Sequence, residues 1–345
     1  MNSSKFSLTL VSLALLAACG GGGGGGGGSN TVEPPPVVTP PPLVLASTIV
    51  TSVPASTYSA GSEELAAFNL LNAERERCGF GLLAQNTAID TAARGHADWL
   101  LINGYTGHYQ VSGTPSFTGV MPDDRLVNAG YGASGQFQSN AETENDQNGT
   151  KTGQGVLGVR DLLSAPYHML EMIRGYRDVG IGVRDRFDVG LSPNNRFVHN
   201  MAFGYKKIDG PQAAALDSVR TYPCEGSTGI VKLLRGENPN PVPGRNLSVS
   251  PLGSSIGVVV DIGNTLVITS AVMIKVATGG AITLRAPVMA ANDPNAVSGV
   301  SYFQNNEGFV SADTPLESNT QYQTTVVGTN SGTPFSRTFT FTTGQ

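Results

Sequence analysis

The sequence predicts an α+β module followed by an all-β module. Apolar residues recur at helical spacing between residues 62 and 104, whereas residues 179–207 hold two runs rich in Val, Ile and Phe, as strands are. Because helices come first and strands later, this region should be α+β rather than a series of βαβ units. From about residue 240, β-branched runs alternate with Gly, Asn and Pro, which favours an antiparallel β-sandwich. We expect the modules at residues 61–224 and 240–345.

The chain begins with a segment typical of a secretory signal. The stretch MNSSKFSLTLVSLALLAAC has one positive charge at Lys5, an eleven-residue apolar run and small residues before Cys19. A membrane span needs about 20 apolar residues, so this run is too short to be one. Its ending resembles the lipobox of bacterial lipoproteins, in which cleavage precedes an acylated cysteine; the alternative is an unprocessed signal.

The lipobox resemblance implies a signal peptide over residues 1–18 and a membrane anchor on Cys19. Gly20 rather than aspartate follows, which in that family implies the outer membrane of a Gram-negative bacterium. Residues 19–60 should form a tether, because nine consecutive glycines are flexible and EPPPVVTPPP is extended. We therefore expect a lipid-anchored protein of the cell envelope.

Composition narrows the function classes and the cysteine chemistry. The formal net charge is −5 and no cluster of basic residues occurs, so nucleic acid is not an expected partner. If Cys19 carries lipid, Cys78 and Cys224 remain, and in an oxidising compartment they should form one disulfide. The alternative is two separate buried thiols.

The helices of the first module have recognisable ends. One begins after Ser62, a favoured N-cap residue, and ends before Gly79; the next begins at Thr87, three residues before Asp90 as in a capping box, and stops at Gly104. Two shorter helices are expected at 155–164 and 166–173, and two strands at 179–185 and 196–207.

His96 and His108 lie on either side of the end of the second helix. If that helix ends near Asn103, they are about 10 Å or more apart along its axis, too far for two ligands of one zinc ion. His96 belongs to the apolar stripe and should be a packed histidine bonded to backbone. His108 lies in a loop, so it is either a functional residue or simply exposed.

Five motifs occur in a recognisable order. They are NLLNAERERCGFGLLAQNTAIDTAARGHADWLLINGYTGH, DRLVNAGY, AETEN, SAPYHMLEMI and YRDVGIGV. In this order they resemble the bacterial branch of the CAP superfamily (cysteine-rich secretory proteins, antigen 5, pathogenesis-related class one), also called the SCP domain. The resemblance implies a three-layer α-β-α sandwich with a central cleft lined by two histidines and two glutamates.

The family's site residues carry over only in part. His108 matches the first histidine, and the first glutamate is Glu142 by spacing or Glu144 by its Glu-Asn pair, with Glu142 slightly favoured. The second glutamate would fall near Ala165, so it is missing. The last histidine should come one residue before His199, and a one-residue slip turns a strand side chain to the opposite face.

His168 matches the histidine of the family's Ser-Pro-Gly-His segment, and Glu171 lies three residues on. Both should share a helix face, so Glu171 either orients His168 or forms an exposed pair. With His108 and Glu142, His168 is a candidate ligand of a divalent metal, zinc or magnesium, with water completing the shell.

Three functions follow from these expectations. We favour a surface binding module whose cleft and grooves take an apolar, lipid-like ligand or a polymeric one. The alternatives are an enzyme, either a metal-assisted hydrolase or a serine-type protease, and a structural envelope protein. A serine protease would need its serine in a nucleophile elbow, a sharp turn from a strand into a helix, and no serine of this chain is expected in one. The end of the chain, TPLESNTQYQTTVVGTNSG and RTFTFTTG, resembles the last strands of bacterial Ig-like domains, and residues 240–345 contain no His, Cys or Trp.

Overall fold

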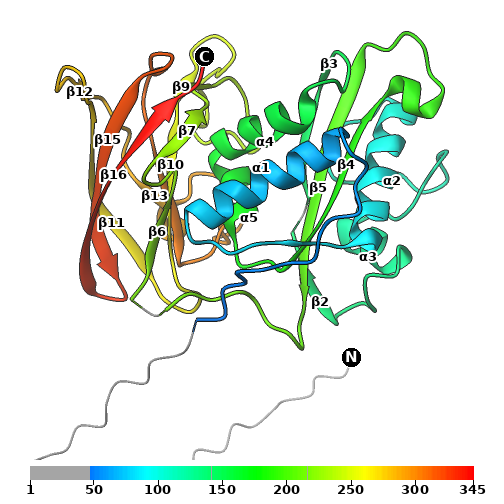
Figure 1. Cartoon of the computed structure of the whole chain (residues 1–345), viewed down its shortest axis with the longest axis horizontal. Coiled ribbons are helices and arrows are strands. Elements are labelled where there is room, and N and C mark those ends of the chain that lie inside the picture. Colours follow the sequence, from blue (N-terminus) through cyan, green and yellow to red (C-terminus); the bar gives the residue numbers. More distant parts are fainter. Residues whose placement is uncertain (1–46, 141, 216) are drawn as a thin grey trace, which may run out of the picture. The chain divides into compact units, whose positions relative to one another are not determined.

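The computed structural model describes residues 47–140, 142–215 and 217–345; the expected signal peptide, Cys19 and most of the tether lie outside these residues. The helices are α1 (Glu63–Arg77), α2 (Thr87–Asn103), α3 (Pro122–Asn128), α4 (Gln154–Ser164) and α5 (Pro166–Ile173), with 3₁₀ turns η1 (Arg186–Val189) and η2 (Ala290–Asn292) (Figure 1). The strands before residue 240 are β1 (Ala84–Gln85), β2 (Phe137–Ser139), β3 (Thr143–Asn148), β4 (Asp178–Asp185), β5 (Arg196–Lys206), β6 (Val219–Tyr222), β7 (Ser227–Ile230) and β8 (Leu233–Leu234). Later strands are β9 (Leu252–Gly253), β10 (Ser255–Val260), β11 (Leu266–Lys275), β12 (Ala281–Ile282), β13 (Val288–Met289), β14 (Glu307–Ser311), β15 (Gln321–Asn330) and β16 (Thr333–Thr343).

The first sheet has the order β1-β4-β5-β2. Strand β3 pairs with the same edge of β5 as β2 does, but along residues 196–201 of β5 rather than 204–206. Strand β5 is antiparallel to β4, β2 and β3, whereas β1 is parallel to β4. One face of this sheet packs against α2 and α3, and the other against α1, α4 and α5. Figure 1 shows the second group of helices between this sheet and the C-terminal strands. The α+β class that the sequence predicts is confirmed.

Two glycines let α2 lie close to β4. A Cβ atom on Gly180 would lie 2.2 Å from the backbone nitrogen of Asp90, and one on Gly182 would lie 2.7 Å from the Cα atom of Arg94. Such distances are far inside van der Waals contact, so larger residues would push the helix away from the sheet. The alternation Val-Gly-Ile-Gly-Val therefore places small residues against α2 and large ones toward α1.

The ends of the first two helices follow the sequence signals with one correction. The Ser62 hydroxyl accepts a hydrogen bond from the backbone nitrogen of Leu65, as an N-cap does. The cap of α2 is Asn86, whose side chain accepts from the nitrogens of Ala88 and Ile89. The capping box expected from Asp90 is wrong, because that carboxylate is turned inward.

Asp90 links α2 to neighbouring segments instead of capping it. Its carboxylate accepts hydrogen bonds from the Tyr58 hydroxyl at 2.5 Å, the Gln85 amide at 2.6 Å and the backbone nitrogen of Ile181 at 2.9 Å. A buried carboxylate that accepts several donors remains satisfied away from water. The local spacing Thr-x-x-Asp did not reveal these distant partners.

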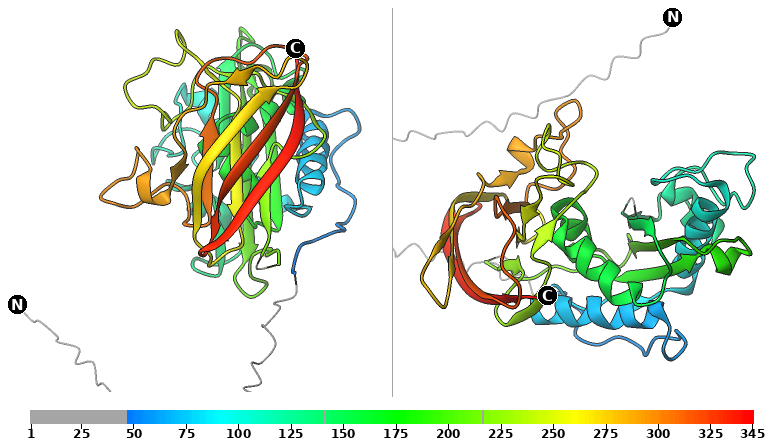
Figure 2. Two further views of the ribbon diagram at one scale, coloured as in Figure 1. Left: turned by 90° about the vertical axis from the view of Figure 1, so that its left-hand side faces the viewer. Right: turned by 90° about the horizontal axis from the view of Figure 1, so that it is seen from above.

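Two further sheets form the C-terminal part. They have the orders β13-β14-β10-β6 and β12-β11-β15-β16-β7, and apolar residues from both belong to one core. Figure 2 shows β11, β15 and β16 side by side in the outer layer. Strands β6 and β7 lie before residue 240, so these sheets take strands from ahead of the expected boundary. That the C-terminal part is an Ig-like domain stays a prediction.

The helices and the C-terminal sheets share contacts throughout. Every residue of β10 is buried, because α5 covers one of its faces and the outer sheet the other. A Cβ atom on Gly257 of β10 would lie 2.9 Å from the terminal methyl of Met169 in α5, and Arg174 forms an ion pair with Glu307 at 2.6 Å. The described residues therefore belong to a single compact unit.

The disulfide expected between Cys78 and Cys224 is present, with a Cα–Cα distance of 5.5 Å. It joins the end of α1 to the turn between β6 and β7. In the ranges 47–140, 142–215 and 217–345, no helix combines the length and apolar character that crossing a membrane requires.

Candidate functional site

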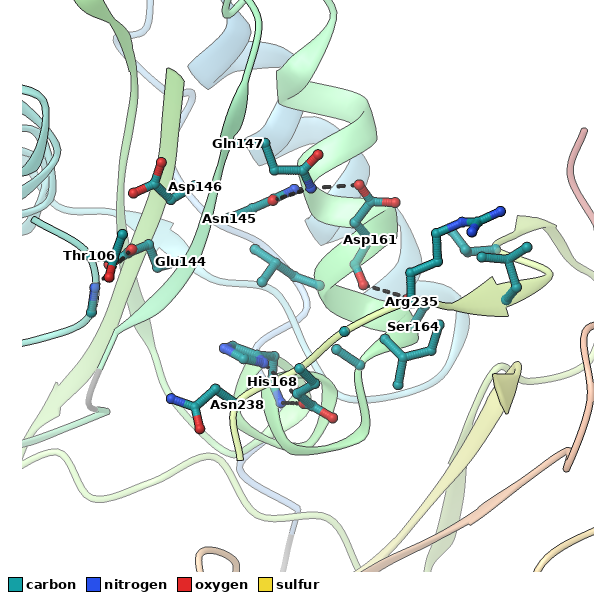
Figure 3. A pocket seen from close by; sticks show the side chains of 18 of the residues that line it. Thr106, Glu144, Asn145, Asp146, Gln147, Asp161, Ser164, His168, Arg235 and Asn238 are labelled. Atoms are coloured by element: carbon teal, nitrogen blue, oxygen red, sulfur yellow. Dashed lines mark hydrogen bonds and ion pairs between the residues drawn. The ribbon is translucent and has the colours of Figure 1, made fainter. Parts of the chain in front are cut away.

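A cavity of about 860 Å³ lies beside the edge strand β3. Its wall comes from the loop 106–108, from β3, from α4 and the start of α5, and from the segment 231–238. Figure 3 shows side chains from these separate elements around a common space, with Asn145, Gln147 and Asp161 linked to one another. Polar and charged residues make up 12 of the 19 in the wall, so the cavity suits a ligand rich in hydrogen-bonding groups.

His96 lies behind the cavity wall and contacts Gly107, which lines it. It is fully buried, its Nε2 atom lies 3.1 Å from the carbonyl oxygen of Gly107, and its Nδ1 atom lies 3.2 Å from the Gln110 amide. Its interpretation as a packed histidine bonded to backbone is therefore confirmed. The loop after Gly104 turns back along α2, so residue 107 lies against His96 and a separation measured along the helix axis is misleading.

Glu144 and His108 form this side of the wall. The backbone nitrogen of Gly107 donates to Glu144 Oε1 at 3.4 Å, and Glu144 Oε2 lies 3.6 Å from His96 Nε2. Burial acts to raise the pKa of Glu144, but His96, His108 and the Gly107 N–H together outweigh it, and the pKa is lowered. Glu144 is therefore an anion at neutral pH.

His108 remains neutral beside this carboxylate. Burial lowers the pKa of His108, and the charges of Glu144 and Glu142 offset only part of that shift. His168 lines the same cavity, and its charge also lowers the pKa of His108. The Nδ1 atom of His108 is buried without a hydrogen-bond partner.

The opposite side of the wall is formed by His168 and Glu237. Glu237 Oε1 lies 3.0 Å from His168 Nδ1 and accepts hydrogen bonds from the backbone nitrogens of Tyr167 at 2.8 Å and His168 at 3.0 Å. Since α5 has no side-chain cap of its own, this distant carboxylate serves as one. Burial raises the pKa of Glu237, although its contacts with His168 and the two N–H groups oppose the shift.

Sequence reasoning missed Glu237. It stands between Gly236 and Asn238 in an irregular segment after the disulfide, 69 residues from His168. No periodicity or cap signal marks it. The structure thus supplies a second wall glutamate from a different part of the chain than the family motif uses.

Glu142 has a supporting position and is not on the cavity wall. Its carboxylate is buried and forms an ion pair with Arg125 at 2.5 Å, and the same guanidinium donates to the carbonyl oxygen of His108 at 2.9 Å. The pair therefore fixes the loop that carries His108. Of the two glutamates in AETEN, the structure places Glu144 in the wall.

Glu171 lies away from His168. It forms an ion pair with Arg174, accepts from the Tyr176 hydroxyl at 3.0 Å, and borders a separate cavity of about 160 Å³. The partner of His168 is Glu237, so Glu171 neither orients that imidazole nor forms the exposed pair considered as the alternative.

The side chain of His199, in β5, is buried between the sheet and α4. It is 0% exposed, and a Cβ atom on Gly158 of α4 would lie 1.8 Å from its Nδ1 atom. Its neighbour Val198 packs instead with α2, so the strand alternation turns His199 to the opposite face as the one-residue slip predicts. Neither ring nitrogen has a hydrogen-bond partner, and His199 does not reach the cavity wall.

The expected metal ligands do not form a coordination set. Glu142 is held by Arg125 outside the wall on which His108 and His168 lie. In the part of the chain that the structure describes, no three or more His, Cys, Asp or Glu side chains are grouped to hold an ion. The arrangement therefore does not fit a zinc or magnesium site, which would need several donors close to one point.

No protein-family model and no curated protein matches this chain. Two of the solved structures that are similar to it are those of a bacterial surface protein and a bacterial extracellular protein. An outer surface protein of Borrelia burgdorferi is 17% identical, with 43% of this chain and 96% of that one covered and a TM-score of 0.31. An extracellular protein of Bacillus anthracis that contains an SCP domain is 18% identical, with 43% and 44% covered and a TM-score of 0.30. Membership of the CAP superfamily stays a prediction.

Proposed function

We propose that this chain is an exported, lipid-anchored binding protein whose cavity takes a polar, polymeric ligand. The observation that carries the proposal is the cavity of about 860 Å³, in which 12 of the 19 residues of the wall are polar or charged. Four segments meet there, and they are fixed by His96, by the Arg125–Glu142 pair and by the Glu237 cap of α5. A site whose groups are already held in place loses little freedom when a ligand binds.

The character of the wall argues against a lipid-like ligand in this cavity. Sites for apolar molecules are lined mainly by aliphatic and aromatic side chains. Here no aromatic residue lines the wall, and its amides and carboxylates would lose water without gaining partners if an acyl chain entered. A hydroxyl-rich chain would replace those lost hydrogen bonds.

The polar contacts favour binding over nucleophilic catalysis. An activated serine or cysteine needs a base within hydrogen-bond reach. Ser164, the serine in the wall, donates its hydroxyl to the carbonyl oxygen of Asp161 at 2.7 Å. All four histidines lie within the described residues, and none is hydrogen-bonded to a serine or cysteine.

The proposal is tested by obstructing the cavity. Gln147 is exposed and lines the wall, so Gln147→Trp should fill the cavity without disturbing the core; Gln136→Trp, on an exposed turn outside it, is the matched control. The full chain, purified in detergent, is titrated with soluble oligosaccharides and polar peptides. We expect at least one probe to bind the wild type and the control at least tenfold more tightly than Gln147→Trp. Equal affinities in the three chains, or no binding of any probe, would overturn the proposal.

A further inference from the structure

Two carboxylates on opposite sides of the cavity, those of Glu144 and Glu237, are held in fixed orientations. The side chain of Glu144 is 8% exposed and its Oε2 atom lies 3.6 Å from His96 Nε2, whereas the side chain of Glu237 is 0% exposed and its Oε2 atom has no hydrogen-bond partner. In both residues the Oε1 atom is occupied by backbone N–H groups, which fixes the orientation of the carboxylate. The buried Oε2 atom of Glu237 thus needs a donor, which a ligand in the cavity can supply.

The charge of the wall is negative. Four carboxylates line it, from Glu144, Asp146, Asp161 and Glu237, and only one of them, Asp146, is paired with an arginine, Arg196. The basic residues of the wall are Arg235 and the two histidines. A positively charged ligand therefore complements the wall, whereas an anionic ligand is repelled.

Resting on the proposed function, we infer that the ligand is a glycan with free amino groups, that is, with unacetylated amino sugars. A primary ammonium carries three donors and no acceptor, which matches a wall of carboxylates and the unpartnered Oε2 atom of Glu237. Sugar hydroxyls both donate and accept, as do the side-chain amides of Asn145, Gln147 and Asn238 in the same wall. A lysine side chain brings the same ammonium but an apolar stem, and so leaves these amides unused.

A matched pair of glycans tests the inference. The full chain in detergent is titrated calorimetrically with the β-1,4-linked tetramer of glucosamine and with the tetramer of N-acetylglucosamine. The second glycan has the same hydroxyl groups but carries neutral amides in place of the charged amino groups. We expect the amino tetramer to bind at least tenfold more tightly. Glu144→Gln and Glu237→Gln should each reduce this preference at least threefold, whereas Glu76→Gln, on the exposed side of α1, should leave it unchanged.

The outcomes separate the inference from the proposed function. If the acetylated tetramer binds as tightly and Gln147→Trp abolishes both interactions, the cavity is a polar binding site and the charge argument is wrong. If trilysine binds more tightly than either glycan, the glycan class is wrong. If none of the three probes binds, the inference is again overturned, and the wider panel of oligosaccharides and peptides decides the proposed function. Because Glu237 also caps α5, thermal unfolding accompanies each titration, and Glu144→Gln tests the charge independently.

Discussion

Replacing His199 should change how the stability of the protein depends on pH. Burial lowers the pKa of this imidazole from 6.5 to about 4, and the nearby backbone of Gln154 offsets only part of the shift. Between these two values the unfolded chain binds a proton that the folded chain excludes. The stabilising contribution of the neutral ring is therefore complete above pH 6.5 and is lost as the pH falls toward 4.

The magnitude follows from the size of the shift. Each pH unit corresponds to about 1.4 kcal/mol, so the folded state should lose about 3 kcal/mol through this group by pH 4. Relative to a typical total of about 5–15 kcal/mol, that loss is large enough to measure. The His199→Leu variant lacks the group but keeps a buried side chain of similar size.

The assay is urea unfolding of both chains between pH 7.5 and 4.5, followed by the fluorescence of Trp99, which is buried in α2. Every other titrating group is shared, so the difference between the two pH profiles isolates the ring. We expect the wild type to lose about 2.5 kcal/mol more than the variant between pH 7.5 and 4.5. Parallel profiles would show that the imidazole is not held neutral, and the reasoning would fail.

Three further substitutions test the packing around the site. Gly158→Ala should destabilise the fold by about 1–3 kcal/mol because its methyl would overlap a buried imidazole, whereas Gly95→Ala, with its nearest neighbour at 3.4 Å, should not. Equal urea midpoints for the two variants would contradict this. Arg125→Met leaves its buried carboxylate partner without a counter-charge, and a loss of about 3–5 kcal/mol is expected by urea unfolding; an unchanged midpoint would mean that the pair carries no net stability. Replacing Cys78 and Cys224 together by serine should cost on the order of 4–5 kcal/mol, and a reductant should lower the midpoint of the wild type but not of the variant.

The sequence predicted helix ends correctly where a residue at the end itself determines them. Ser62 caps α1 and Gly104 ends α2 with a φ of 73°, as their residue types indicate. The helix expected at 166–173 has those bounds, because Pro166 is suited to a first turn. By contrast, Asp90 has partners in three other segments, and its spacing from Thr87 imitated a capping box.

The candidate site was only partly visible in the sequence. The motif order drew attention to His108, Glu144 and His168, and the structure brings all three to one wall. The motif order could not distinguish Glu142 from Glu144, because the choice depends on Arg125, which forms a buried ion pair with Glu142. Glu237 was missed because its role depends on its contact with the start of α5, which only the folded structure brings next to it.

The parallel pairing of β7 with β16 has a consequence for how the site is completed. Strand β7 precedes the segment that delivers Glu237 to α5, yet about 100 residues of chain separate it from the strand that pairs with it. During synthesis, His108 and His168 are made before Glu237, the partner of His168, and long before the strand that pairs with β7. A chain that ended before β16 would therefore lack the strand that pairs with β7, just ahead of the segment that carries Glu237.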